Sequence, residues 1–525
     1  MSSRYFVVAL VAAIAAGCTV LIPAASGSYG HAYQIAHLNI RTHAMYGSLD
    51  PGYTQNCFST YCRFFYERLL GFNPQGQVVP QLALSIKNPV PDTYDITLRR
   101  GVKFWDGSEM TSDDVANSLN YERFPKFNSS IALRIIKNVK PLSKYVVRVS
   151  LRHPDASFGL QLAASGMIFS KKFQQAAGEN FGKPGTLTMA TGPFRPTSFD
   201  GKTKIELVAN PRWWGGKVNV GSVTINLITD DTAAALAIRS GQIDAGAGYG
   251  DPRAMASALG SAGTVTKVVF GTAQKYWSMN VKQPPFDDIH FRRAVAYATN
   301  RAEYIAAEGG GVPLTTMITP IQLAQIASPA QINTLLKSLN TYPFSIAKAK
   351  AELAQSKYAS NVPKTSINCP PFGINACQVL SAQLGRVGIP VQVNEVPTLS
   401  YVNEIYGPKT FGWIYGYIGC IGPDPSGCVG YTLGSDHLSQ INTAQYAPPD
   451  LDKLLAEGVR TLNKAKRFAI YSQILKRLAQ DVPYVPYALP VYSVMVSNKY
   501  TWPGLAATKS NIIFDSPWVL NLRPK

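Results

Sequence analysis

The sequence lacks the short motifs that mark common hydrolases, metalloproteases and nucleotide-binding proteins. It contains no GxSxG, no HExxH, no GxxxxGK[ST] phosphate loop and no GxGxxG after a strand. Cysteine and histidine never occur at CxxC or HxxxH spacing, which the usual zinc sites require. We therefore expect a binding protein rather than an enzyme, with no cofactor and no bound metal. Scattered Ser, His and Asp residues leave an exported hydrolase open as the alternative from another class.

Long apolar runs are also absent, apart from a short one near the N-terminus. Arg4 precedes an apolar segment, residues 5–16, which has the length of a secretory signal core and is too short for a stable membrane anchor. It ends at Ala15-Ala16-Gly17-Cys18, which resembles a lipoprotein processing box, although leucine is usual in place of Ala15. We expect residues 1–17 to be a signal peptide and 18–30 a tether.

This N-terminus predicts an exported protein, held in the periplasm or at the outer face of the cytoplasmic membrane by a lipid on Cys18. The alternative is a soluble exported protein that loses the cysteine together with its signal. Either way, the compartment permits disulfide bonds.

Cysteine is scarce, and six of the seven residues fall into three close pairs. The pairs are Cys57 with Cys62, Cys369 with Cys377, and Cys420 with Cys428. An even number at short spacing in an exported chain is typical of local disulfides. Six cysteines allow about fifteen pairings, so the local pairing is a preference.

Acidic residues are few, with 31 Asp and Glu against 50 Lys and Arg, and the formal net charge is +19. Loss of residues 1–17 removes only Arg4 and leaves +18. The basic residues are scattered and no RNA-binding motif lies among them, so we expect no nucleic-acid partner. A solvated basic face, or attraction to anionic lipid or wall polymer, accounts better for the charge.

The length of 525 residues exceeds what one hydrophobic core usually supports, so we expect two or three domains. Apolar periodicity predicts strands and helices that are mixed without strict alternation. The expected strands are 32–39, 93–99, 145–151, 205–209, 223–227, 391–396, 485–489 and 491–496. The expected helices are 63–70, 232–240, 291–308, 346–356, 379–387, 450–462 and 464–480.

One segment, TLRRGVKFWDGSEMTSDDV at residues 97–115, predicts a strand, a tight turn and a helix. Thr111 opens the helix, because its hydroxyl can accept from the backbone N–H near Asp114, and Asp113 and Asp114 place favourable negative charge in the first turn. The segment closely resembles the signature region of the large extracytoplasmic solute-binding proteins that serve ABC-type importers of peptides, nickel and related solutes. Other family motifs follow in order. They are LDP at 49–51, YERLL at 66–70, VPQLA at 79–83, TGPF at 191–194, WW at 213–214, GQID at 241–244, PPFDD at 284–288 and DVP at 481–483. Their fixed order over roughly residues 31–500 identifies the chain as a member of this family.

The resemblance implies an α/β, two-lobed periplasmic-binding-protein-like fold of the large type II, or cluster C, class. Mixed sheets flanked by helices would form two lobes around a ligand cleft. Lobe 1 would combine residues 31–75, 190–278 and 492–525, with 76–189 inserted as an accessory domain, and lobe 2 would span 279–491.

The implied function is capture of a small solute, most often a peptide, by closure of the lobes. A monomer would then deliver the solute to an ABC permease in the cytoplasmic membrane. A non-peptide solute on the same fold, such as an oligosaccharide, an opine or a metal chelate, stays open. So does an envelope sensor that works without a transporter.

The resemblance also implies a cleft loop that runs from Trp413 to Asp424. In peptide-binding members, a tryptophan followed three positions later by aspartate packs against the ligand and ion-pairs its α-amine, but position 416 here is Gly. Asp424 is the candidate replacement, or else it only turns the chain. Tyr415 and Tyr417 alternate with Trp413, so a strand would present all three rings on one face.

Four further contacts complete the expected site. Tyr53 and Asn56 lie where the family offers contacts from the first loop, opposite the tyrosines. Trp277 and Asn280 lie on the approach to the second lobe.

Overall fold

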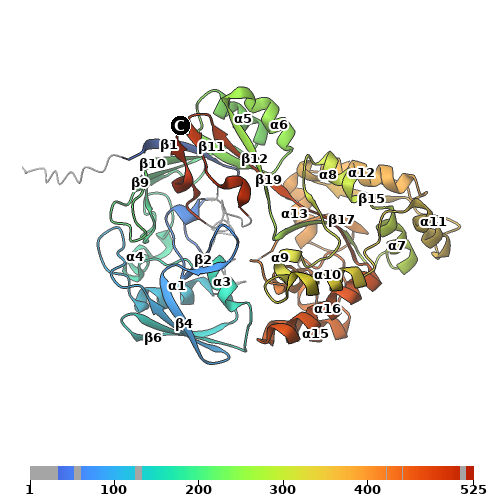
Figure 1. Ribbon diagram of the computed structural model, residues 1–525, viewed down its shortest axis with the longest axis horizontal. Helices are drawn as coiled ribbons and strands as arrows, with labels where there is room; N and C mark the ends of the chain where they lie inside the picture. Colours follow the sequence, from blue (N-terminus) through green and yellow to red (C-terminus); the bar gives the residue numbers. More distant parts are fainter. Residues whose placement is uncertain are drawn as a thin grey trace, which may run out of the picture.

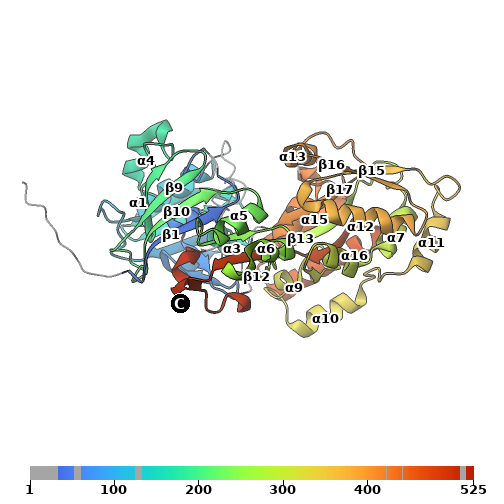
Figure 2. The ribbon, with the colours of Figure 1, turned by 90° about the horizontal axis from the view of Figure 1, so that it is seen from above.

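The computed structural model has two lobes that lie side by side along its longest axis (Figures 1 and 2). It describes residues 33–45, 47–52, 61–124, 133–420, 422–439, 441–508 and 516–525. No helix in these ranges is long and apolar enough to cross a membrane.

Lobe 1 is built on a seven-stranded sheet with the order β12-β19-β11-β1-β10-β9-β8. The strands are β1 (Ile35–Thr42), β8 (Phe194–Phe199), β9 (Lys204–Ala209), β10 (Val220–Leu227), β11 (Ala245–Gly248), β12 (Gly263–Val269) and β19 (Val491–Ser497). β1 runs parallel to β10 and β11, and the remaining pairs are antiparallel. Helices α5 (Asp231–Arg239) and α6 (Pro252–Leu259) pack beside β11 and β12.

An accessory domain follows β1 in the chain and has its own four-stranded antiparallel sheet, β4-β5-β7-β6. Its elements are β4 (Ala83–Val90), β5 (Thr93–Leu98), α1 (Ser112–Glu122), β6 (Ile136–Ser143), β7 (Val146–Leu151), α3 (Phe158–Ala164) and α4 (Lys171–Ala177). A separate apolar cluster fills it, in which Ile96, Leu119 and Val149 are fully buried. A capping box starts α1, in which the Thr111 side chain contacts the Asp114 backbone as predicted and the Asp114 carboxylate accepts from the Thr111 N–H at 2.9 Å.

Lobe 2 contains a four-stranded antiparallel sheet, β14-β18-β13-β17, and the parallel pair β15-β16. The strands are β13 (Ala273–Met279), β14 (Val312–Pro313), β15 (Thr365–Cys369), β16 (Val391–Glu395), β17 (Trp413–Gly419) and β18 (Tyr484–Leu489). The main helices are α7 (Ile289–Ala298), α8 (Arg301–Ala307), α10 (Pro329–Ser338), α11 (Ile346–Gln355), α12 (Ile374–Gly385), α13 (Thr398–Tyr406), α14 (Ser426–Thr432), α15 (Pro449–Arg460) and α16 (Lys464–Asp481).

The chain passes between the lobes twice, from β12 to β13 and back from β18 to β19. The two passages run together, because the Phe270 N–H donates to the Pro490 carbonyl at 2.9 Å. Two short connections side by side provide a natural hinge, since few backbone dihedrals have to change when the lobes move.

Three expectations from the sequence need correction. Residues 63–70 form a short 3-10 turn (Cys62–Phe64) and the start of β2 (Leu70–Phe72) in place of a helix, because this segment is buried on every side. The helix expected over 291–308 is two helices, since the Asn300 side chain caps α8. Residues 273–278, expected in lobe 1, belong to β13, which pairs with β17 and β18 in the sheet of lobe 2.

Candidate ligand-binding cleft

A cavity of about 1230 Å³ lies between the lobes and has walls from both. Lobe 1 contributes residues near the starts of α5 and α6, and the accessory side contributes Phe72 and Ala164. Lobe 2 contributes the strand β17 and the helix α13. The cavity is larger than the 300–1,000 Å³ typical of small-molecule sites, so it has room for a solute of several residues.

Strand β17 forms the floor of the cavity, and residues 414–419 border it, among them the partly buried Tyr417 and the fully buried Tyr415. Gly416 lies between them and faces Tyr276, its partner on β13. A Cβ atom added at Gly416 would overlap the Tyr276 ring. The side chain that the family resemblance led us to expect at position 416 is therefore excluded by an aromatic ring that occupies its space.

A buried ion pair borders this floor. The Lys275 ammonium lies 2.9 Å from a carboxylate oxygen of Glu308, and both side chains are at most one-tenth exposed. The Tyr487 hydroxyl donates to the same oxygen at 3.2 Å. The Lys275 ammonium also lies 5.8 Å from the centre of the Tyr417 ring. Lys275 thus lines the cavity as a cation whose charge is already balanced.

The lobe 1 wall carries three aspartates at the starts of two helices. Asp230 caps α5, Asp251 caps α6 and ion-pairs with Arg253 at 2.7 Å, and Asp231 ion-pairs with Arg41 at 2.7 Å. Sequence reasoning missed this wall. Asp230 and Asp251 are recognisable in the sequence as residues that can start a helix. The sequence does not show, however, that the fold brings the starts of both helices to the cleft.

His43 also lines the cavity and packs edge-on against the Tyr249 ring at 5.0 Å. Burial and the neighbouring Arg41 guanidinium lower the pKa of His43 to about 4. His43 is therefore neutral at physiological pH and adds no charge to the cleft.

Three predicted contact residues lie in the core of lobe 2 and do not line the cavity. Trp413 packs against Phe286 and donates its Nε1–H to the Ser366 carbonyl at 3.0 Å. Trp277 is fully buried beside Tyr487, with 5.5 Å between the ring centres. Asn280 donates its amide to the Phe411 carbonyl at 3.0 Å. These side chains support the wall from behind.

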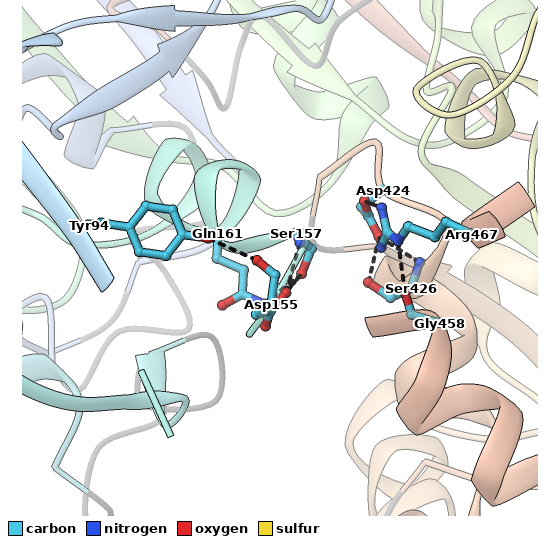
Figure 3. A network of polar contacts seen from close by, with 8 residues as sticks. All are labelled: Tyr94, Asp155, Ser157, Gln161, Asp424, Ser426, Gly458 and Arg467. Carbon is cyan, nitrogen blue, oxygen red and sulfur yellow. Dashed lines mark hydrogen bonds and ion pairs between the residues drawn. The ribbon is translucent and has the colours of Figure 1, made fainter. Parts of the chain in front are cut away.

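Asp424 is buried and fully engaged within lobe 2. The Arg467 guanidinium donates to its two oxygens at 2.7 and 2.6 Å, and the Ser426 N–H donates at 2.8 Å (Figure 3). The Arg467 Nε–H in turn donates to the Gly458 carbonyl at the end of α15. This geometry gives Asp424 the turn-forming role, and we assign it no contact with a ligand amine.

The remaining predicted positions divide between described and undescribed residues. Tyr53, Asn56, Cys18 and Cys57 lie outside the described residues. Cys62 is buried in the core of lobe 1. The sulfur atoms of Cys369 and Cys377, and those of Cys420 and Cys428, lie at bonding distance.

The accessory domain touches lobe 2 beside the cleft. The Ala156 N–H donates to the Val459 carbonyl near the end of α15, with 2.9 Å between nitrogen and oxygen. Figure 3 shows that a polar network supports each side of this boundary. On the accessory side, Asp155 accepts from the Ser157 N–H at 2.7 Å and from the Gln161 amide at 3.1 Å. On the lobe 2 side is the Asp424–Arg467 pair.

The family model for bacterial extracellular solute-binding proteins, family 5 Middle, matches residues 77–440. The chain belongs to this family. The family resemblance noted in the sequence is thereby confirmed, and the two-lobed α/β fold is confirmed by the solved structures below.

Several relatives cover most of the chain. The glutathione-binding protein GsiB of Pectobacterium atrosepticum is 26% identical over 83% of this chain and 85% of its own length. Di/tripeptide-binding protein 2 of Pseudomonas aeruginosa is 24% identical over 86% of this chain and 90% of its own. Heme-binding protein A of Haemophilus influenzae is 24% identical over 81% of each chain.

Solved structures share the fold at lower identity. The DppA protein of Helicobacter pylori in complex with the peptide STSA superposes with a TM-score of 0.75, at 22% identity, over 93% of this chain and 98% of that one. NikZ of Campylobacter jejuni in complex with Ni(L-His) gives a TM-score of 0.77 at 17% identity, over 94% and 100%.

Proposed function

We propose that this protein is the extracytoplasmic solute-binding component of an ABC transporter, which captures a peptide or peptide-like solute and delivers it to a membrane permease. The observation that carries the proposal is the cavity of about 1230 Å³ walled by both lobes of a chain that crosses between them twice. A solute in this cavity contacts both walls only when the lobes are closed.

Capture and shape change are then one equilibrium. A solute that binds the closed form more tightly than the open form shifts the equilibrium toward the closed form. The size of the shift is set by the ratio of the two affinities. The closed form presents a surface across both lobes, which a permease can distinguish from the open one. The cleft needs no catalytic group for this task, so we propose binding without turnover.

Peptide-like solutes are favoured by the relatives named for glutathione and for di- and tripeptides. Other members of the fold are named for different cargo, such as the AgaA protein with agropinic acid at 21% identity and a TM-score of 0.75. A non-peptide solute, such as an oligosaccharide, an opine or a metal chelate, is therefore the second candidate. In either case we propose Tyr417 as a ligand-facing aromatic residue, since it lines the cavity and is only partly buried, whereas Tyr415 borders the same space but is fully buried.

The same proposal covers compartment and attachment. The signal-like N-terminus supports export and a lipid on Cys18, and the two sulfur pairs at bonding distance support disulfides in an oxidising compartment. We also propose that the domains divide as the sheets do, with the protein acting as a monomer. Replacement of Cys18 by Ala should release the protein from the membrane fraction.

The decisive experiment combines a melting-temperature screen with small-angle scattering. Di- to hexapeptides, sugars and metal chelates are incubated with the protein, and solutes that raise the melting temperature saturably are then tested for a smaller radius of gyration. Mass spectrometry of each solute after incubation checks for turnover. A chemically altered solute would favour the hydrolase alternative, and an unchanged radius with every stabilising solute would refute closure.

A further inference from the structure

The floor of the cleft offers no carboxylate at position 416, where the family resemblance implies a contact with a ligand amine. Gly416 has no side chain, and the Tyr276 ring occupies the space that a Cβ atom would need. Glu308 borders this floor but is paired with Lys275 at 2.9 Å. Asp424, which follows β17 in the chain, is held by two hydrogen bonds from Arg467 and is only 1% exposed. A ligand ammonium that reached this floor would lose its hydration without gaining a counter-ion.

The backbone of the same strand is also occupied. The Tyr401 hydroxyl donates to the Tyr415 carbonyl at 2.6 Å, on the side of β17 away from β13. A peptide that added itself to this edge as a further strand would need that carbonyl. Strand addition at Tyr415 is therefore blocked by α13, which carries Tyr401.

In place of these polar anchors, the helix α13 and its neighbours present apolar surface to the cavity. Phe372, Val402 and Tyr406 line the cavity and are 43%, 37% and 56% exposed. Large hydrophobic side chains that stay exposed within a concave site mark a surface that a ligand covers. Apolar and aromatic contact is thus what this wall can supply.

Most of the other charged groups of the cleft cannot act as a counter-ion for a ligand ammonium. Asp231 and Asp251 are paired with arginines, Lys275 is balanced by Glu308, and His43 is neutral at physiological pH. Among the described carboxylates that line the cavity, only Asp230 has no ion-pair partner, and it lies exposed at the rim, where it caps α5.

We propose that the cleft selects peptide-like solutes with aromatic or apolar side chains and without a free α-ammonium, such as N-acylated or cyclic peptides. This inference rests on the proposed capture of peptide-like solutes and narrows it to one chemical class. The selecting residues are Tyr276, which excludes a side chain at position 416, and Tyr401, which occupies the strand edge.

The test uses matched peptide pairs. Tri- to pentapeptide amides rich in Phe, Tyr and Leu are each made with a free and with an acetylated N-terminus, and their dissociation constants are measured by calorimetry. We expect the acetylated member to bind about tenfold tighter or more. Equal or tighter binding of the peptide with the free N-terminus overturns the inference. If the Asp230→Asn variant then loses the preference for the free N-terminus, the peptide ammonium binds at Asp230 on the rim of the cavity.

Failure of both members of every pair to bind also overturns the inference, because the solute is then not of this class. It leaves the proposed capture function standing as long as another solute of the screen draws the lobes together. The two failures are thus distinguishable by scattering on the same protein.

Variants of the floor test the residues directly. The double variant Tyr276→Ala with Gly416→Asp opens the space and fills it with a carboxylate, so the preference should reverse in favour of the free amine. Tyr276→Ala alone is the matched control, since it opens the space without adding charge, and should keep the preference for acetylated peptides. If the double variant folds and still prefers acetylated peptides, position 416 does not have the proposed role. If the double variant does not fold, the matched peptides measured on the wild-type protein decide the inference.

Discussion

Glu67 is a buried carboxylate whose surroundings make the stability of lobe 1 depend on pH. It accepts hydrogen bonds from the Trp213 indole at 3.1 Å, the Trp214 indole at 2.7 Å and the Thr191 hydroxyl at 2.8 Å. Burial nevertheless dominates these favourable contacts and raises the pKa of Glu67 to about 7. The folded protein therefore holds this proton more tightly than the unfolded chain does.

The sign of the resulting pH dependence follows from linkage. Above its unfolded pKa, near 4.5, Glu67 ionises readily only in the unfolded chain, so the free energy of unfolding falls as pH rises from about 4.5 to about 7. The loss is on the order of 2–3 kcal/mol. Chemical unfolding of Glu67→Gln across this pH range should show a flatter profile than wild type. The exposed Glu179→Gln is the control and should keep the wild-type slope; parallel profiles for all three proteins would contradict the prediction.

The Asp424–Arg467 pair gives a second prediction. Both side chains are at most 4% exposed, so Asp424→Ala leaves a buried guanidinium without its partner and should cost about 3–5 kcal/mol of stability. The double variant Asp424→Ala with Arg467→Met removes both charges and should recover much of that loss. Thermal unfolding of the two variants measures the difference. Equal melting temperatures for the single variant and the wild type would show that the Asp424–Arg467 pair does not contribute this much to stability.

The start of α1 provides a prediction that concerns a whole element. The Asp114 carboxylate accepts from the Thr111 N–H at 2.9 Å and also from the Lys171 N–H of α4 at 3.0 Å. Asp114→Ala should therefore lower stability by about 1–2 kcal/mol, since it uncaps α1 and loosens α4. Asp113→Ala is a matched control, because Asp113 is exposed in the same first turn and feels the same helix dipole. Similar midpoints of chemical unfolding for both variants would contradict the capping role.

This helix also shows what the sequence could predict. Capping residues act within a few positions, so the starts of α1 at Thr111 and of α11 at Ser345 followed from local chemistry alone. The break between α7 and α8 was missed because the residues on either side of Asn300 are compatible with one continuous helix, and only the structure shows that the Asn300 side chain caps α8. The segment 63–70 was mistaken for a helix because an apolar run does not reveal burial on every side.

The site was predictable only in part, for a related reason. Alternation along β17 predicted one shared face for Trp413, Tyr415 and Tyr417, but it could not show that Phe286 and Ser366 cover Trp413. Nothing local to Asp424 indicates that Arg467, 43 positions away, takes its carboxylate. Contacts between residues so far apart in the sequence leave no periodic pattern, so only the three-dimensional structure reveals them.

The two-lobed shape itself could not be derived from periodicity, because strands of one sheet come from opposite ends of the chain. β1 and β19, for example, both flank β11 in lobe 1. The two-lobed shape was predicted from the ordered series of family motifs. The structure adds the contacts between the lobes on which closure depends. One of these is the hydrogen bond from Ala156 of the accessory domain to Val459 of lobe 2.

This contact gives a prediction for the whole molecule. Ala156 directly follows Asp155 in a turn in which the Asp155 carbonyl accepts from the Phe158 N–H, a position that tolerates proline. Ala156→Pro therefore removes the donor to Val459 while the turn is kept. The ligand-free protein should then populate more open forms, with a larger radius of gyration by small-angle scattering. Solute affinity should fall by about two- to tenfold, because one hydrogen bond of roughly 0.5–1.5 kcal/mol no longer favours closure.

Ala156→Ser retains the N–H and serves as the control, with the radius and affinity of wild type. If the proline variant scatters like the serine variant, the contact does not bias the lobes, and the hinge at Phe270 and Pro490 alone sets their resting angle. If instead affinity falls while the radius stays constant, the bond acts only in the closed complex. Measuring both quantities on the same two variants therefore separates a latch that holds the empty protein from one that forms around its solute.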